Sequence, residues 1–329
     1  MIRAKIAGIG SYVPERVLTN QELTKIVDTS DEWITTRTGI KERRIAREDE
    51  NTSDMCVQAA LPALEMAGMQ PEDIDMVIAG TVTPDYRLPS MSCIIQKKMG
   101  FVNAASMDIV AACAGFIHGL SIAQAYIQSG KFKNILVFGS EKLSSVTDYK
   151  DRNTCILFGD GAGAAVVSAS SDDSDSGILA TYLKSDGRLD ELLHIPAGGT
   201  NLPFAGNGST DRSYYCIKMN GSEVFKYAVR YMGDAAANVV KQAGLTSDQV
   251  DLLVPHQANI RIIKATAARL KIPMDRVYIN LERFGNTSAA SVPIALDEAV
   301  RSGRIKPGDN VLSVAFGGGL TWGAILIRW

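Results

Sequence analysis

The chain has 329 residues, of which 46% are hydrophobic and 21% charged, and its formal net charge is -2. Because this length exceeds the roughly 100–200 residues of one ordinary domain, we expect two domains or one duplicated architecture with a large buried core. The near-neutral charge, without a dense block of Lys and Arg, argues against a nucleic-acid partner.

The same composition predicts where the protein works. The first residues contain no apolar run of signal-peptide length, and no stretch approaches about 18 consecutive apolar residues. We therefore expect a soluble, cytoplasmic protein with no membrane partner. The five cysteines are odd in number and form no CxxC pair, which argues against both a disulfide framework and a zinc site.

In chain order, the first half alternates strand and helix patterns. Residues 1–10 read as a strand, and Pro14 after it makes a dinucleotide-binding turn improbable. Capped helix starts follow near Asn20 and Ser30, then a helix over residues 53–66 and a buried strand over 75–79. The glycine-rich residues 159–167 are typical of a close-packed strand. The acidic, Ser-rich residues 169–176 are the best linker, so we place the boundary between halves 1–172 and 173–329.

Residues 106–128 predict a strand that runs through Cys113 directly into a helix. Phe116, Leu120, Ala123 and Ile127 recur at helical spacing, so the helix begins at or just after the cysteine. A thiol at a helix N-terminus lies beside unpaired N–H groups, which favour the thiolate and lower its pKa. The alternative is a small buried cysteine at a tight junction.

A weak internal repeat lies on either side of the linker. Residues 67–78 align without gaps on residues 243–254, and residues 130–139 resemble residues 303–312 in the same order. Each copy reads as the end of a helix, a loop and a buried strand. Two α/β halves related by a pseudo-twofold axis would explain the pattern, and functional sites tend to form between such halves.

The second half supplies polar partners for Cys113. The apolar run Leu252–Pro255 delivers His256 at its end, and Asn286 lies in a turn before the predicted helix of residues 291–300, where we place the counterpart of Cys113. Cysteine, histidine and asparagine could therefore converge at the junction of the halves. Alternatively, His256 is a satisfied polar residue and Asn286 caps its helix.

Four motifs together resemble the β-ketoacyl-acyl-carrier-protein synthase III family of the thiolase superfamily. They are AACAGF around Cys113, VPHQANIR around His256, GNTSAASVP around Asn286, and AFGGGLTWG near the C-terminus. The resemblance extends from SDEWITTRTGIKERR to TWG. It implies an α/β, thiolase-like, five-layered αβαβα fold made of two duplicated halves, a homodimer, and the first condensation of type II fatty-acid synthesis.

The resemblance also implies roles for individual residues. The catalytic set would be Cys113, His256 and Asn286, with the N–H groups of Cys113 and Gly318 as the oxyanion hole. No cofactor and no metal is implied, since acyl-CoA is a substrate. Contacts to CoA would come from Thr29, Trp33, Arg37, Arg152, Phe225 and Asn259. The acyl carrier protein would meet Gln257, Ala258, Asn259, Ile260 and Arg261.

Two positions depart from relatives. Asn153 follows Arg152 where glycine is common, which affects the fine placement of the nucleotide. Leu88 stands where some acetyl-selective relatives carry a phenylalanine that closes the acyl pocket across the dimer interface. A leucine there predicts an acyl pocket that also admits four-carbon or branched primers.

Three other functions are compatible with this superfamily. One is a ketosynthase of secondary metabolism. Another is a hydroxymethylglutaryl-CoA synthase-like enzyme, which would need a catalytic glutamate near the first repeat's strand end, where Thr81-Val82-Thr83-Pro84 contains no acid. The third is a non-catalytic protein that binds acyl-CoA or the carrier protein, which would have lost Cys113, His256 or Asn286.

Overall fold

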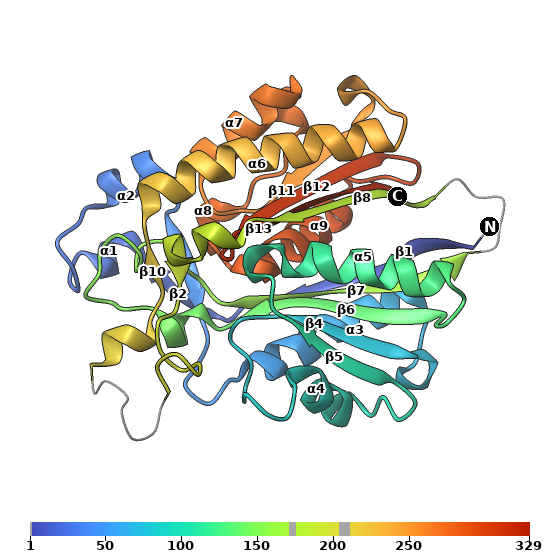
Figure 1. The fold of residues 1–329 in the computed structure, drawn as a ribbon, viewed down its shortest axis with the longest axis horizontal. Coiled ribbons are helices and arrows are strands. Elements are labelled where there is room, and N and C mark those ends of the chain that lie inside the picture. Colours follow the sequence, from blue (N-terminus) through green and yellow to red (C-terminus); the bar gives the residue numbers. More distant parts are fainter. Residues whose placement is uncertain (1, 171–175, 204–210) are drawn as a thin grey trace.

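Two β-sheets form the framework of the protein (Figure 1). The computed structural model describes residues 2–170, 176–203 and 211–329. The first sheet has the order β1-β7-β6-β4-β5, with strands Arg3–Tyr12 (β1), Met76–Gly80 (β4), Ala105–Ile109 (β5), Asn134–Glu141 (β6) and Gly161–Ser170 (β7). The second has the order β11-β12-β13-β8, with strands Gly177–Ser185 (β8), Leu252–Pro255 (β11), Asn310–Gly317 (β12) and Thr321–Arg328 (β13).

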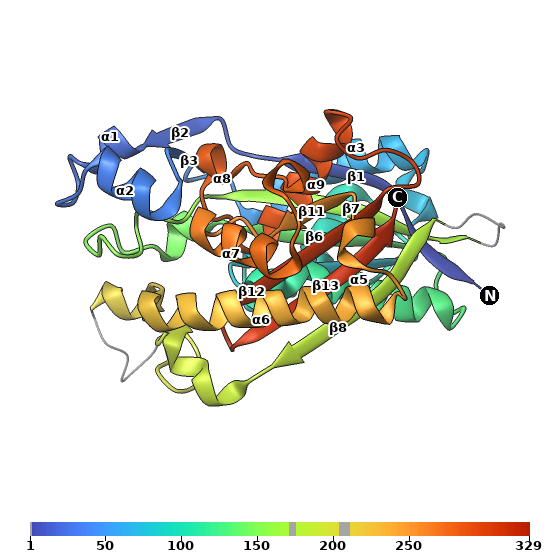
Figure 2. The same cartoon turned by 90° about the horizontal axis from the view of Figure 1, so that it is seen from above.

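Helices cover both sheets and fill the space between them. The outer face of the first sheet is covered by Thr52–Ala67 (α3) and Met91–Met99 (α4), and the outer face of the second by Gly221–Gln242 (α6) and Ile260–Leu270 (α7). Between the sheets lie Gly115–Gln128 (α5) and Ser291–Arg301 (α9). Figure 2 shows α6 lying along β12 and β13. This arrangement confirms the predicted five-layered αβαβα fold.

Several shorter elements complete the fold. They are β2 (Arg16–Thr19), α1 (Asn20–Leu23), α2 (Asp31–Thr38), β3 (Glu42–Ile45), β9 (Leu193–His194), β10 (Lys218–Met219) and α8 (Leu281–Phe284). Of these, α1, α2, β2 and β10 lie at the side of the molecule away from the two termini (Figure 1). β2 pairs with β3 and β9 with β10, in two short antiparallel ribbons.

The central strands are buried on both faces, which explains their continuous apolar sequences. In β6, Leu136 and Phe138 pack in the cluster that contains α3, whereas Ile135 and Val137 pack in the cluster that contains α5 and α9. Successive side chains of a strand point to opposite faces, so one strand contributes to two core layers. Each central strand therefore packs against helices on both faces of its sheet.

The two halves repeat the same local structure at an offset of 176 residues. In the first, the carboxylate of Asp75 accepts the N–H of Asn134 at 2.9 Å. In the second, the carboxylate of Asp251 accepts the N–H of Asn310 at 2.7 Å. Both bonds tie the start of a parallel strand to its neighbour, which confirms the predicted duplication. The boundary between 172 and 173 lies outside the described residues and stays a prediction.

One detail of the predicted repeat is wrong. At the offset of 176, the short 3-10 turn Ala112–Ala114 (η2) matches Ser288–Ala290 (η8), and the first residue of each has a positive φ, 44° at Ala112 and 50° at Ser288. The counterpart of Cys113 is therefore Ala289. Asn286 lies three residues before that position, in the segment between Gly285 and η8.

The turn η8 approaches β6 closely at Gly139. A Cβ added there would lie 2.2 Å from the carbonyl oxygen of Ala289, a distance that real Cβ atoms do not adopt. Only glycine lets the backbone of η8 contact the strand. The small residues of β7 act similarly, since a Cβ at Gly163 would lie 2.5 Å from the Pro293 side chain in α9.

We expect Gly139→Ala to lower the free energy of unfolding by about 1–3 kcal/mol, because the added methyl group must push η8 away from the strand. Gly187→Ala is the matched control, since a Cβ at Gly187 meets no atom within 4 Å, and its effect should stay within about 0.5 kcal/mol. Denaturant unfolding followed by circular dichroism measures both. Equal stability of the two variants would contradict the contact.

Candidate active site

Cys113 lies in η2, at the junction of β5 and α5, as the sequence predicts. It is buried, and its N–H precedes the first hydrogen bond of the turn, from the Ala114 N–H to the Ala111 carbonyl. The N–H of Cys113 is therefore one of the unpaired donors expected at a helical start.

The electrostatics of Cys113 differ from the prediction. Burial raises the pKa of the Cys113 thiol to about 12, and hydrogen bonding by the Ser288 side chain opposes this increase only in part. The helix N-terminus was expected to lower the pKa, but loss of solvation is the larger effect in this enclosed position. The resting group is therefore a thiol, which must give up a proton before it can attack a carbonyl carbon.

His256 follows β11 and is buried, and burial lowers the pKa of its imidazole to about 3. Its Nδ1 lies 2.6 Å from the Ser291 Oγ, which also accepts the N–H of Gln257 at 3.3 Å. Within the described residues the Ser291 hydroxyl has no other acceptor, so it donates to Nδ1. The neutral ring then carries its proton on Nε2, and it can donate a hydrogen bond.

Asn286 is buried, and a hydrogen bond orients its side-chain amide. Its Oδ1 accepts the N–H of Ser288 at 2.9 Å, and its backbone bonds to Leu157 and Gly159. Because Oδ1 is engaged, the NH2 group is left to donate. His256 and Asn286 both line one cavity with Cys113, and each presents a neutral donor to it.

The turn between β12 and β13 passes beside the cysteine. A Cβ at Gly317 would lie 2.5 Å from the backbone nitrogen of Cys113, so only glycine permits this approach. Gly318, the next residue, lines a cavity together with Cys113. The predicted oxyanion-hole pair, Cys113 and Gly318, therefore lines one cavity.

Three cavities lead from the surface to Cys113 and beyond. The outer cavity, of about 950 Å³, includes Trp33, Arg37 and Arg261, and shares Phe225 and Asn259 with a narrow cavity of about 110 Å³. The narrow cavity reaches Cys113. A third cavity of about 360 Å³ continues from Cys113 and is lined mainly by apolar side chains. The thiol thus lies between a polar entrance and an apolar end.

Comparisons with known proteins agree with this geometry. Residues 107–187 match the family model of 3-oxoacyl-[acyl-carrier-protein] synthase III, and residues 240–329 match the model of its C-terminal part. The chain is 55% identical to β-ketoacyl-[acyl-carrier-protein] synthase III of Caldanaerobacter subterraneus subsp. tengcongensis over 100% of this chain and 98% of the relative. It belongs to the β-ketoacyl-[acyl-carrier-protein] synthase III family.

Solved structures of the family have the same fold. The crystal structure of the synthase III from Aquifex aeolicus is 51% identical, with a TM-score of 0.91, over 99% of this chain and 100% of that chain. The enzyme from Thermus thermophilus is 44% identical, with a TM-score of 0.92, over 99% of both chains. This synthase III is therefore a condensing acyltransferase of fatty-acid synthesis.

Trp33 and Arg37, two of the residues predicted to bind CoA, line the outer cavity, and Arg152 lies over the same Trp33 ring. The guanidinium of Arg37 lies 4.5 Å and that of Arg152 5.3 Å from the centre of the Trp33 ring. An adenine ring between Trp33 and Arg152 needs about 7 Å, twice the stacking distance, so Arg152 must move to admit one. Arg152 is now held by Asp28, through its carbonyl at 3.0 Å and its carboxylate at 3.5 Å. The nearby Thr29 has a buried hydroxyl without a hydrogen-bond partner.

One predicted carrier-protein contact of this synthase III is corrected. Gln257 is only 1% exposed, and its amide donates to the carbonyls of Pro255 and Tyr278 while its Oε1 accepts the N–H of Asn280. Its side chain therefore cannot meet a partner at the surface. Residues 258–260 are partly exposed and Arg261 is exposed, with its guanidinium 5.5 Å from the Phe225 ring centre.

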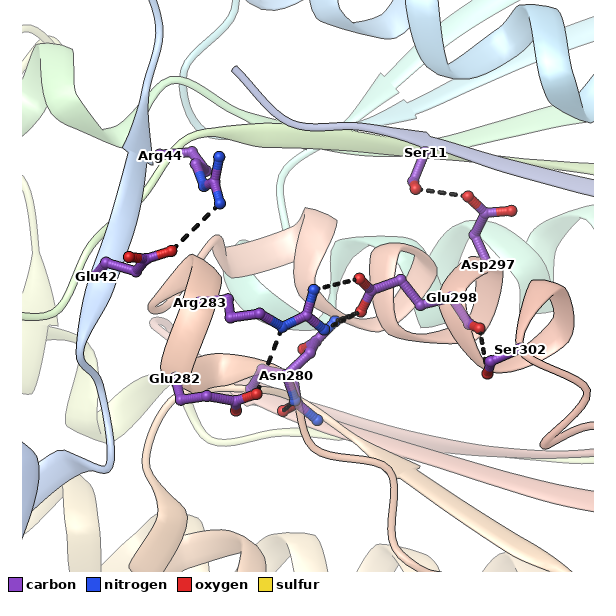
Figure 3. A network of polar contacts seen from close by, with 10 residues as sticks. Ser11, Glu42, Arg44, Asn280, Glu282, Arg283, Asp297, Glu298 and Ser302 are labelled. Carbon is purple, nitrogen blue, oxygen red and sulfur yellow. Dashed lines mark hydrogen bonds and ion pairs between the residues drawn. The ribbon is translucent and has the colours of Figure 1, made fainter. Parts of the chain in front are cut away.

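The contacts of Gln257 continue into a polar network (Figure 3). Asn280 donates to the Glu298 carboxylate at 2.7 Å, and Arg283 donates to both oxygens of the same carboxylate. Glu298 and Ser291 both belong to α9, so this helix fixes the His256 loop at two points. Asn280, Arg283 and Glu298 do not line any of the three cavities described above, so the network supports the His256 loop from outside them.

Leu88 lies outside the cavities of its own chain. Its side chain is 88% exposed, near the edge strand β5, where Val110 is 78% exposed and also lines the apolar cavity. The single chain therefore brings no part of Leu88 to Cys113. Its predicted role in the acyl pocket depends on a second copy of the chain.

Sequence reasoning missed one buried acid beside the site. Glu141, at the end of β6, is fully buried, and its carboxylate accepts hydrogen bonds from the segment Thr81–Thr83 and from Ser288. The neighbouring residues in the sequence do not mark Glu141 as buried, because an acid at the end of an apolar strand is commonly exposed. The offset of 176, which aligns Glu141 with Gly317 beside Cys113, was the available signal.

The described residues contain neither a group of side chains suited to a metal ion nor a helix suited to crossing a membrane. Within residues 2–170, 176–203 and 211–329, no group of three His, Cys, Asp or Glu side chains could hold a metal ion. In the same part of the chain, no helix has the length and apolar character needed to cross a bilayer.

Ser291→Ala should slow condensation by about 10- to 100-fold while leaving acylation of Cys113 nearly unchanged, because it removes the buried donor that fixes the His256 tautomer. Ser291→Thr keeps a hydroxyl and should restore most of the rate. Nitrogen-15 NMR of labelled histidine reports which ring nitrogen carries the proton. Ser302→Ala, a serine beyond the end of the same helix, is the control. An unchanged His256 spectrum in Ser291→Ala would contradict the assignment.

Proposed function

We propose that this synthase III condenses a short acyl group from acyl-CoA with malonyl-acyl-carrier-protein through an acyl-Cys113 intermediate, giving 3-oxoacyl-carrier-protein, CoA and CO2. One observation carries the proposal: a thiol and two neutral hydrogen-bond donors line one narrow cavity that joins a polar entrance to an apolar end. A thioester substrate has the matching shape, with a polar arm, a reactive carbonyl and an apolar tail.

Acyl transfer begins with attack of the Cys113 sulfur on the thioester carbonyl. The oxyanion then accepts hydrogen bonds from the N–H groups of Cys113 and Gly318, which are already in place before the reaction. The acyl chain extends into the apolar cavity of about 360 Å³, and CoA leaves through the entrance. A covalent intermediate divides one slow transfer into two faster ones.

Condensation uses the hydrogen-bond donors of His256 and Asn286. Loss of CO2 from the malonyl group leaves negative charge on the thioester oxygen, as an enolate. His256 Nε2–H and the Asn286 NH2 group would donate to this oxygen, and burial keeps the imidazole neutral because the pKa of His256 is lowered to about 3. The enolate carbon then attacks the acyl-Cys113 carbonyl. No cofactor takes part in these steps.

The polar entrance fits a phosphorylated arm. Trp33, Arg37 and Arg152 would bind the nucleotide of CoA, Thr29 lies beside them, and Phe225 and Asn259 would contact the pantetheine arm. The carrier protein, which is acidic in this family, would dock on Arg261 with Ala258, Asn259 and Ile260 near it.

A homodimer would complete the acyl pocket. Leu88, Tyr86 and Val110 are 88%, 63% and 78% exposed, and they lie on the side of the edge strand β5. Pairing of two copies at this edge would bury these side chains and carry each Leu88 to the partner's apolar cavity. The cytoplasmic location and the absence of nucleic-acid and membrane partners stay predictions from the sequence.

The two half-reactions should separate by mutation. Cys113→Ala should take up no acyl group but keep slow decarboxylation of malonyl-carrier-protein, because His256 and Asn286 remain. His256→Ala and Asn286→Ala should still be acylated while condensation falls about 100- to 1,000-fold. Mass spectrometry of the protein and release of CO2 measure the two steps. Near-normal condensation in either variant would remove that residue from the mechanism.

Carrier recognition should depend on one exposed charge. Arg261→Glu should raise the KM for malonyl-carrier-protein by about tenfold or more at low salt, with a smaller change for acyl-CoA. Arg269→Glu, two turns further along α7, makes the same change in charge and is the control. A loss of equal size with both substrates would indicate a structural role for Arg261.

A further inference from the structure

The carboxylate of Glu141 has an unusual set of contacts. Its Oε2 accepts hydrogen bonds from the hydroxyl of Thr83 at 2.6 Å and from that of Thr81 at 3.2 Å, and both oxygens accept the N–H of Val82. Its Oε1 accepts the hydroxyl of Ser288 at 3.2 Å. Within the described residues no Lys or Arg forms an ion pair with it, so the charge is balanced only by neutral donors.

Ser288 connects this carboxylate to the nucleophile. Its hydroxyl donates to Glu141, it lines the apolar cavity with Cys113, and its turn η8 packs against η2, so the hydroxyl lies beside the thiol. A hydroxyl has one proton and two lone pairs, so it can accept from the thiol while it donates to the carboxylate. Ser288 has a positive φ of 50° and begins the tight turn η8, which packs against both β6 and η2.

We propose that Glu141 receives the proton of Cys113 through the Ser288 hydroxyl during acyl transfer, and that it stores this proton for the life of the acyl-enzyme. This inference rests on the proposed function, since it requires Cys113 to be the nucleophile. Glu141 is then a positioning residue that acts through Ser288, and Ser288 is the group that would hand the proton on from the sulfur.

Atoms and charges balance at each step. As the C–S bond forms, the thiol proton passes to Ser288 Oγ while the hydroxyl proton passes to Glu141 Oε1, and the CoA thiolate leaves and takes a proton from water. After condensation, the C–S bond of the acyl-enzyme breaks and Cys113 leaves as a thiolate. The proton of Glu141 returns through Ser288 to that sulfur. The cycle ends with the starting thiol and carboxylate.

Other groups at the site cannot serve as well. The Nδ1 of His256 is occupied by Ser291, and its Nε2 carries a proton, so the ring has no lone pair facing the thiol. The buried thiols of Cys113 and Cys56 both interact electrostatically with Glu141. Burial raises the pKa of Glu141 to about 7, which suits an acceptor that must both take and return a proton.

The first test compares Glu141→Gln with Asp297→Asn. Asp297 is also a buried carboxylate that accepts a serine hydroxyl, from Ser11 at 2.6 Å, but it lies away from the cavities. Single-turnover acylation by acetyl-CoA, followed by mass spectrometry across pH, is the readout. We expect Glu141→Gln to be about 100-fold slower at pH 7 and to lose the rise in rate near neutral pH, whereas Asp297→Asn should keep that rise.

Ser288→Ala provides a second variant. It breaks the same path, so combining it with Glu141→Gln should slow acylation no further than either change alone. A purely structural Glu141 would lower stability without moving the pH profile. Retention of the profile in Glu141→Gln, or independent effects of the two changes, would overturn the proposal.

A third measurement needs no variant of Glu141. Infrared difference spectra of the unaltered enzyme, before and after acylation, should show a new protonated carboxylic acid, and carbon-13 labelling of glutamate should shift its band. Acyl-enzyme without this band overturns the proton path but leaves Cys113 as the nucleophile. Acylation of Cys113→Ala would instead overturn the proposed function itself.

Discussion

The active site depends on the close approach of two short turns, η2 and η8, one from each half of the chain. The glycine at 139 lets η8 contact β6, and the glycine at 317 lets the β12–β13 turn contact η2. Neither contact can accommodate a Cβ. Because each turn begins a central helix, these backbone contacts fix where the N-termini of α5 and α9 lie against the sheets.

Duplication explains why the site is asymmetric within a symmetric frame. The two halves share the strand, the turn with positive φ and the helix. At the equivalent positions of the second half, however, Ala289 replaces Cys113 and Gly317 replaces Glu141. One half thus keeps the nucleophile and a buried acid. In the other half, Gly317 has no side chain and so leaves room for the backbone nitrogen of Cys113. That half also supplies Asn286, just before η8.

The sequence predicted the positions of Cys113 and His256 well, because each follows an apolar strand and precedes a helix, and such local patterns are readable. It did not predict the thiol's pKa or the burial of Gln257, since both depend on how completely distant segments enclose a group. Glu141 was missed for the same reason. Its neighbours in the chain are ordinary, and only the fold brings Ser288 and Thr83 to it.

Neighbouring cavities share lining residues, and Cys113 lines both the narrow cavity and the apolar one. Under the proposed function, the arm of CoA and the arm of the carrier protein would both reach Cys113 through the narrow cavity. They cannot occupy it together. The first product has to leave before the second substrate enters, so the kinetics should be of the double-displacement type, with each substrate competing for the other's form of the enzyme.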